Sequence, residues 1–279
     1  MRCFSHGAAF LGLASLGQAQ QRDIVLATTT SVRDAGLLEF LLPRFERESG
    51  RSVRVIAVGS GQAMELGRWG EVDILIVHAP EAEVEFMAQG YGSERLPLAH
   101  NEFVIVGPRG DPANVRGFTS AVAAFQAIAR SRPRFVSRGD RSGTQAKELL
   151  LWKLAGVAPN PKTDAWYVES GQGMGATLTI TSQRRAYTIS DRATYLAQQA
   201  NLDLVVLFEG DPQLLNIYHV IQVDPEKFDN LNDDGAAAFA DFLVSKKGQA
   251  IIRDFGVEEF GQPLFVPDAG KSEEDLGQQ

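Results

Sequence analysis

Short apolar runs alternate with amphipathic segments along most of the chain. In its first part, the runs lie at 24–27, 53–58, 72–77 and 103–106. They contain almost only apolar residues, which is typical of parallel strands buried on both faces. Between the first two runs, residues 35–49 place leucine and phenylalanine at helical spacing, and Gly50 follows where the helix would end. The pattern predicts parallel strands joined by helices.

A second series of elements follows a turn-rich break at 107–112. We expect helices at 122–130, up to 154, from 192, at 236–245 and ending at 256, with strands at 134–136, 166–168, 186–189, 204–208 and 217–223. This order predicts an α/β protein of two doubly wound lobes joined by crossing strands. Lobe 1 would comprise residues 20–108 and about 212–267, lobe 2 residues 109–211, and residues 268–279 a polar tail.

The first 19 residues differ from the rest of the chain. Arg2 precedes an apolar stretch at 8–16, and Ala19 ends a small-residue cleavage signal, so we expect a secretory signal peptide and a periplasmic mature protein. Cleavage would remove Cys3, the only cysteine, and with it any disulfide or thiol chemistry. The remaining 26 basic and 35 acidic residues give a net charge of about −9, which disfavours nucleic acid as a partner.

The segment Ser-Arg-Gly-Asp-Arg-Ser-Gly-Thr at 137–144 is the strongest candidate for function. It joins an apolar run to a helical stretch, so Ser142 or Thr144 would cap a helix whose first N–H groups are free. A helix N-terminus favours anions, and Arg138 adds a permanent positive charge there. The segment therefore predicts an oxyanion site. Taken alone, it fits an ordinary capped helix with a surface arginine equally well.

Three further polar turns also separate a strand from a helix. They lie at 28–31 (Thr-Thr-Thr-Ser), 59–62 (Gly-Ser-Gly-Gln) and 170–173 (Ser-Gly-Gln-Gly). Each alone is a weak signal, but together they let both lobes present hydroxyl and N–H donors to one cleft. None has the lysine of a nucleotide-binding P-loop. The candidate ligand-binding residues are Thr29, Thr30, Ser31, Ser60, Gly61, Arg138, Ser142, Gly143, Thr144, Ser170 and Gly171.

Catalytic and metal-binding functions have less support. We find no Gly-x-Ser-x-Gly motif, no recognisable nucleophile with its base, and no metal-ligand spacing among His78, His100 and His219, so we expect neither catalytic residues nor a cofactor. His78 follows a predicted strand and could face the cleft. Residues 230–241 loosely resemble a calcium loop, but an Asn or Asp helix cap is the better interpretation.

These motifs resemble the substrate-binding components of tungstate ABC transporters, within the type II periplasmic binding-protein superfamily. The resemblance rests, in order along the chain, on residues 28–31, 58–63, 73–80, 101–108, 137–144 and 186–192. It implies a monomeric clamshell that closes on tungstate or molybdate and delivers it to a membrane permease driven by a cytoplasmic ATPase. It also implies ligand contacts from Thr30, Ser31, Ser60, Arg138 and Ser142–Thr144.

Selectivity among tetrahedral anions depends on the protons in the cleft. Tungstate and molybdate only accept hydrogen bonds at neutral pH, whereas phosphate keeps a proton and needs an acceptor. We hypothesise a cleft that offers only donors. An inward-facing Asp73 or Asp140 would reverse this and favour phosphate, the alternative ligand. Asp73 has either Arg138 or backbone N–H groups as its expected partner. The choice of tungstate over molybdate follows from the resemblance alone.

Overall fold

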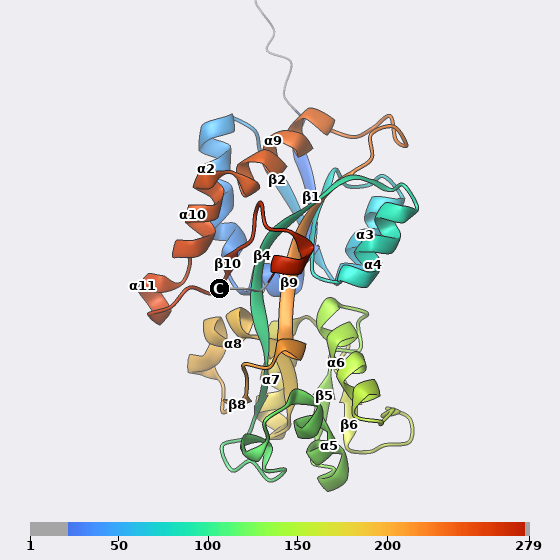
Figure 1. Cartoon of the computed structure of the whole chain (residues 1–279), viewed down its shortest axis with the longest axis vertical. Helices are drawn as coiled ribbons and strands as arrows, with labels where there is room; N and C mark the ends of the chain where they lie inside the picture. The colour runs from blue at the N-terminus through green and yellow to red at the C-terminus, as the bar shows by residue number, and fades with distance from the viewer. Residues whose placement is uncertain (1–21, 277–279) are drawn as a thin grey trace, which may run out of the picture.

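The computed structural model of the chain describes residues 22–276 and confirms an α/β fold of two lobes (Figure 1). The predicted signal peptide lies outside the described residues. The sheet of the first lobe has the order β10 (Val266–Pro267), β4 (Gly92–Gly107), β9 (Leu215–Val223), β3 (Ile74–Val77), β1 (Ile24–Thr29) and β2 (Val53–Val58). Strands β1, β2 and β3 are parallel, as their apolar sequences predict, whereas β9 and β4 run antiparallel to their neighbours.

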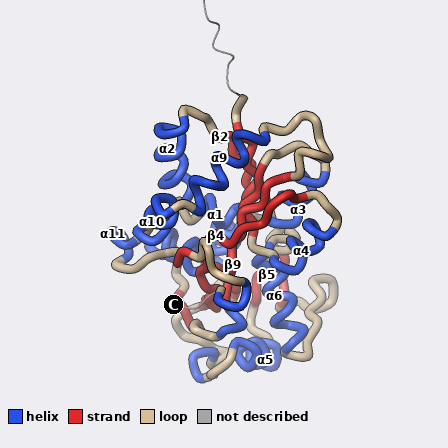
Figure 2. The backbone as a smooth tube through the Cα atoms, turned by 45° about the horizontal axis from the view of Figure 1, so that its top comes forward, coloured by secondary structure: helices blue, strands red, loops and turns tan. Residues whose placement is uncertain are grey.

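Helices cover both faces of this sheet. They are α1 (Thr30–Asp34), α2 (Leu37–Ser49), α3 (Ser60–Arg68), α4 (Pro80–Ala88), α9 (Asp233–Val244), α10 (Lys246–Asp254) and α11 (Val257–Phe260). On one face α2 packs against α9, where the rings of Phe45 and Phe239 lie 4.8 Å apart. Helices α3 and α4 lie on the other face (Figure 2). They bury Met64 and Phe86 there. The strand ends between these helix layers form the edge that faces the second lobe.

The second lobe is smaller. Its strands are β5 (Phe135–Ser137), β6 (Tyr167–Glu169), β7 (Thr188–Asp191) and β8 (Val205–Phe208), and its helices are α5 (Ala121–Ser131), α6 (Gly143–Leu154), α7 (Met174–Arg184) and α8 (Arg192–Gln198). Short 3₁₀ turns lie at Val115–Gly117, Gln199–Asn201 and Pro212–Leu214, and another, outside this lobe, lies at Glu273–Asp275. An aromatic core fixes α5 and α6 to β5, with the Phe125 and Trp152 rings 4.4 Å apart and those of Phe135 and Trp152 5.2 Å apart. This core holds α6 against β5 and α5.

Strand β4 connects the two lobes. Its first part pairs with β9, up to Glu102, and from Phe103 it pairs with β7 and β8. The apolar run at 103–106 predicted only the second part, because the first part is polar and contains Pro97, next to which the register shifts. The lobe limits expected at 108 and 211 stay a prediction, and the strand changes partners slightly before the first of them.

Local signals located most helix ends. Gly50, with φ of 69°, ends α2 as predicted, but Gly36, with φ of 85°, divides the expected helix at 35–49 from a short preceding helix, α1. Asn232 caps α9 by accepting from the Gly235 N–H at 3.1 Å, as expected for a cap. Asp268, where we expected a solvated tail to begin, is instead buried and bonded to His100. None of the helices within residues 22–276 combines the length and apolar character needed to cross a membrane.

Candidate functional site between the lobes

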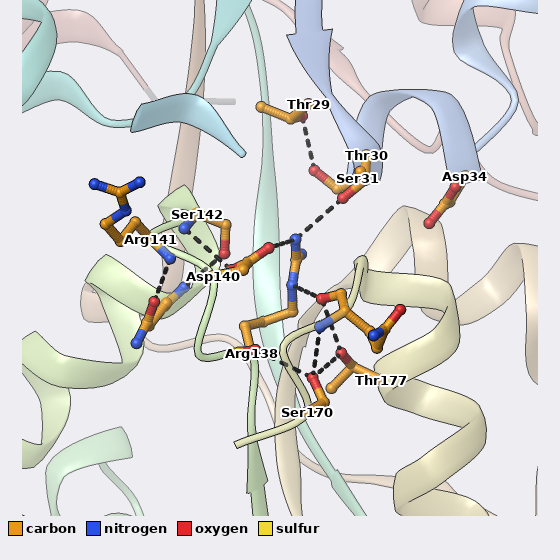
Figure 3. Close-up of polar contacts among 12 residues, drawn as sticks. Thr29, Thr30, Ser31, Asp34, Arg138, Asp140, Arg141, Ser142, Ser170 and Thr177 are labelled. Carbon is orange, nitrogen blue, oxygen red and sulfur yellow. Dashed lines mark hydrogen bonds and ion pairs between the residues drawn. The ribbon is translucent and has the colours of Figure 1, made fainter. Parts of the chain in front are cut away.

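Arg138 lies at the centre of the contact between the lobes (Figure 3). Only 2 % of it is exposed, so the alternative of a surface arginine is wrong. Its Nε donates to the Gln172 carbonyl at 2.9 Å, and its Nη2 donates to Thr30 Oγ1 at 3.1 Å and pairs with the Asp140 carboxylate. The guanidinium is therefore anchored in the second lobe and reaches the first.

Neither of the two carboxylates that we considered is free to face a ligand. Asp140 uses one oxygen for Arg138 and accepts from the Ser142 N–H at 3.1 Å with the other. Asp73 accepts from the N–H groups of Val25 and Asn232, both at 2.7 Å, so Arg138 is not its partner. It precedes β3, at the opposite end of that strand from His78. A free carboxylate from these two residues is absent from the site.

The start of α6 supplies donors beside Arg138. Ser142 caps the helix by accepting from the Gln145 N–H at 3.2 Å, which settles the choice between Ser142 and Thr144. Helix geometry leaves the N–H groups of Gly143 and Thr144 without an acceptor inside the helix. The Thr144 hydroxyl is buried and has no hydrogen-bond partner among the described residues. Unused donors therefore gather at this helix end.

The first lobe contributes neutral groups. Thr29 ends β1 and caps α1, where its Oγ1 lies 2.9 Å from Ser31 Oγ. Ser31 Oγ in turn lies 3.3 Å from His78 Nε2. Ser60 begins α3 on this side, and its hydroxyl lies 3.5 Å from the His78 N–H. All four side chains are buried. These four residues contribute hydroxyls and an imidazole but no fixed charge.

A hydrogen-bonded chain sets the state of His78. Its Nδ1 lies 2.8 Å from Asn216 Oδ1, and the Asn216 amide N–H groups are used on Asn101 Oδ1 and the Tyr218 hydroxyl, both at 2.8 Å. Asn216 Oδ1 is therefore an acceptor, so His78 carries its hydrogen on Nδ1 and offers a lone pair at Nε2 to Ser31. Burial lowers the pKa of His78 to about 4, so the ring is uncharged at neutral pH.

Ser31 and His78 form a hydroxyl–imidazole pair that the sequence did not reveal. The pair has the composition of a nucleophile with its base. However, a pKa of about 4 makes His78 a weak base at neutral pH, and contacts between the lobes enclose the serine. The geometry therefore gives a polar lining better suited to holding a ligand than to activating a nucleophile.

Glycines let the two lobes touch at several points. A Cβ on Gly143 would lie 2.5 Å from the His78 carbonyl oxygen, and one on Gly61 would lie 3.1 Å from that of Arg141. Asp34 accepts from the Gly175 N–H at 3.1 Å, across the same gap. The structure is thus a closed form in which backbone meets backbone on either side of Arg138.

Ser170 and Gly171 lie behind Arg138. The Ser170 hydroxyl donates to the Arg138 carbonyl at 3.1 Å, and the Gly171 N–H donates to the same oxygen at 2.9 Å. Their predicted direct contact with a ligand stays untested, and their observed contacts support the arginine backbone. Asp34 and Asn216 escaped sequence reasoning because no motif marks them, and Asp191 was noticed only as part of the segment 186–192 that carries the resemblance. Only their position after or beside a polar turn could have indicated them.

A pocket of about 560 Å³ opens next to this site. Its lining includes Phe103, Gly143, Lys147 and Asn216. Burial lowers the pKa of Lys147. Within residues 22–276 no cluster of three or more His, Cys, Asp or Glu side chains has the geometry of a metal site. The groups available to a ligand are therefore mainly hydrogen-bond donors and one guanidinium.

Known proteins resemble this chain over most of its length. Residues 14–247 match the family described as PBP superfamily domain. A tungstate-binding protein TupA from Peptoclostridium acidaminophilum is 45% identical over 89% of this chain and 86% of its own. Two solved structures also match. The tungstate ABC transporter structure from Geobacter sulfurreducens is 46% identical, covers 84% of this chain and 98% of its own, and has a TM-score of 0.76. Tungstate-binding protein TupA from Desulfovibrio alaskensis is 41% identical, covers 88% of this chain and 98% of its own, and has a TM-score of 0.72.

Proposed function

Because this chain belongs to the tungstate-binding proteins of the periplasmic binding-protein superfamily, we propose that it captures tungstate between its two lobes. It would act outside the cytoplasm as the solute-binding component of an ABC importer, with molybdate as a second ligand. Its partners would be a membrane permease and the ATPase that drives it. The bound oxyanion would be cargo rather than a cofactor, and the protein would have no catalytic function.

The buried Arg138 is the observation that carries this proposal. A guanidinium that is 2 % exposed needs an anionic partner, and Asp140 engages Nη2 while Nε is used on a carbonyl. A tetrahedral dianion would accept from the guanidinium N–H groups that these contacts leave and bring Thr30 and the start of α6 together around it. Such bidentate or forked contacts are the usual way in which arginine holds oxyanions.

Donors surround the proposed ligand position from both lobes. The second lobe offers the N–H groups of Gly143 and Thr144 and the free hydroxyl of Thr144. The first lobe offers Thr30 and, beside it, the hydroxyls of Ser31 and Ser60. Both Asp140 oxygens already accept hydrogen bonds from the protein, which leaves this residue less able to accept one from hydrogen phosphate. This supports tungstate over phosphate.

Isothermal titration of the mature protein, starting at Gln20, with tungstate, molybdate, sulfate and phosphate tests the proposal. We expect tight tungstate binding, with molybdate close behind and phosphate far weaker. If phosphate bound most tightly, an acceptor other than Asp140 or Asp73 would have to face the ligand. If none of the four anions bound, the proposed function would be wrong.

A further inference from the structure

Asp191 is a buried carboxylate beside the candidate site that no contact described above uses. It ends β7 and caps α8, where one of its oxygens accepts from the Thr194 N–H at 2.8 Å. The side chain is fully buried, and its second oxygen has no hydrogen-bond partner within the described residues. A buried carboxylate with an unused oxygen is costly to keep ionised, because water is replaced by nothing of equal polarity.

The position of Asp191 ties it to both lobes. The Thr194 hydroxyl, one turn along α8, donates to the Ser31 carbonyl at 3.2 Å, so the start of α8 lies against the Thr-Thr-Thr-Ser segment. Asp191 is also within the electrostatic influence of Arg138. An oxyanion held by Arg138 and the residues around Ser31 would therefore compete with Asp191 for the positive charge of Arg138.

Four titratable groups from the elements packed around Asp191 bear on its charge. Arg138, before α6, favours the ionised carboxylate, whereas Asp34 on α1 disfavours it. Tyr218 on β9 stays uncharged because burial raises its pKa well above the usual value. His78 stacks on Tyr218 and is uncharged at neutral pH. Burial dominates this balance and raises the pKa of Asp191 to about 6.

We propose that Asp191 takes up a proton from solvent when the oxyanion binds, and that this loss of negative charge allows a dianion into the cleft. The inference rests on the proposed function. Before binding, Arg138 stabilises Asp191 together with Asp140. A bound dianion competes for the same guanidinium and adds repulsion, so the carboxylate gains a proton and its charge is lost. The protonated oxygen becomes an O–H donor where an unpaired acceptor stood before.

The linkage has a defined direction in pH. Asp191 is already protonated in the free protein well below pH 6, so binding there takes up no proton and the tungstate Kd is constant. Above pH 6 the free protein loses the proton that the complex keeps. The Kd then rises with pH, by up to about tenfold per unit, until the complex also loses its proton.

Titration calorimetry of the mature protein with tungstate tests this, in two buffers of different ionisation enthalpy. At pH 7.5 we expect the apparent binding enthalpy to differ between the buffers by the amount that proton uptake requires, and at pH 5 to be the same in both. Asp191→Asn keeps a capping oxygen and stays uncharged, so its enthalpies should agree at both pH values, with a Kd that no longer rises between pH 6 and 8.

Glu148→Gln is the matched control. Glu148 lies on α6 beneath the site, and burial raises its pKa to about 7, so it also titrates in this range. Its carboxylate accepts from Trp152 and Tyr167 and faces the aromatic core, so proton uptake should persist in this variant. Equal enthalpies in both buffers for the wild-type protein at pH 7.5 would overturn the inference, as would uptake lost only in Glu148→Gln. Were Asp191→Asn not to fold, Asp191→Ser, which also caps a helix and carries no charge, would take its place, and absent uptake in the wild-type protein would still overturn the inference. No tungstate binding at any pH would overturn the proposed function instead.

Discussion

The two halves of the candidate site differ in how they carry charge. The half that follows β5 holds a fixed positive charge on Arg138, partly balanced by Asp140, at the start of a twelve-residue helix. The half that follows β1 and β3 presents hydroxyls and an uncharged imidazole, and the Asp34 carboxylate on α1 is used on the Gly175 N–H of the other lobe. One lobe thus supplies attraction, whereas the other supplies neutral donors that matter once the lobes close.

This division explains how an acidic protein can hold a dianion. The chain has a formal net charge of −8, so its overall field repels anions. Attraction must therefore be local and shielded from solvent, as it is for a guanidinium that is 2 % exposed. A second fixed positive charge on the other half would repel Arg138 and hold the lobes apart before the ligand arrived. Neutral hydroxyls avoid this repulsion.

Removing the charged half should have the largest effect. We expect Arg138→Ala to weaken tungstate binding by about 2–5 kcal/mol, because it leaves Asp140 unpaired beside the ligand as well as removing the guanidinium. Titration calorimetry measures the change. Arg47→Ala, at an exposed position on α2, is the matched control and should bind like the wild-type protein. Unchanged affinity in Arg138→Ala would exclude Arg138 as a ligand contact.

Preventing the halves from meeting should have the next largest effect. Gly143→Ala would place a Cβ 2.5 Å from the His78 carbonyl, and backbone on both sides cannot give way easily. We expect tungstate binding to weaken by about 1–3 kcal/mol, in line with overpacking of a close contact. Small-angle scattering of the tungstate complex should also give a larger radius of gyration than that of the wild-type complex.

The control for Gly143→Ala is Gly110→Ala. A Cβ at Gly110 meets no atom within 4 Å, so this variant should leave both affinity and scattering unchanged. Wild-type affinity in Gly143→Ala would mean that the close approach of α6 to His78 is not part of the bound state.

Removing a single neutral donor should have the smallest effect on tungstate binding. Thr144→Val removes a buried hydroxyl that has no partner among the described residues but keeps the side-chain shape. We expect tungstate binding to weaken by about 0.5–1.5 kcal/mol, while the free energy of unfolding without ligand does not fall. Urea denaturation and titration measure the two quantities.

Thr181→Val should show the opposite behaviour. Its hydroxyl donates to the Thr177 carbonyl at 2.7 Å inside α7, so the variant should lose stability and keep its tungstate affinity. If Thr144→Val behaved in this way instead, Thr144 would be a structural residue and the donors of α6 would be its backbone N–H groups alone.

Sequence reasoning succeeded where local signals decide the structure. The parallel strands β1, β2 and β3, a hydroxyl cap at Ser142 or Thr144 and the end of α2 at Gly50 follow from short patterns of apolar, hydroxyl and glycine residues, and the structure then chose Ser142. The turn at 137–144 was recognised because an arginine beside a helix start is a local feature. That Arg138 is buried and meets Thr30, 108 positions earlier, could not be read in this way.

The rest of the site depends on contacts between distant residues. His78 owes its tautomer to Asn216, which is 138 positions away on a strand that crosses the lobes. Asp34 meets Gly175 only because the lobes close. Even Asp73, whose residue type was noticed, needed the fold to decide between Arg138 and two backbone N–H groups. No period or motif encodes such pairings, so they appear only once the sheet is assembled.

The most direct test of the account is to locate the anion itself. A crystal of the mature protein with tungstate, measured at the tungsten absorption edge, gives the metal position from its anomalous signal. We predict a single strong peak between the lobes. The oxygens of the tungstate there should lie within hydrogen-bond distance of Arg138, Thr144 and the Thr30–Ser31 turn. A peak elsewhere, or a protein that excludes tungstate from this cleft while Arg138 stays paired with Asp140 alone, would contradict the account.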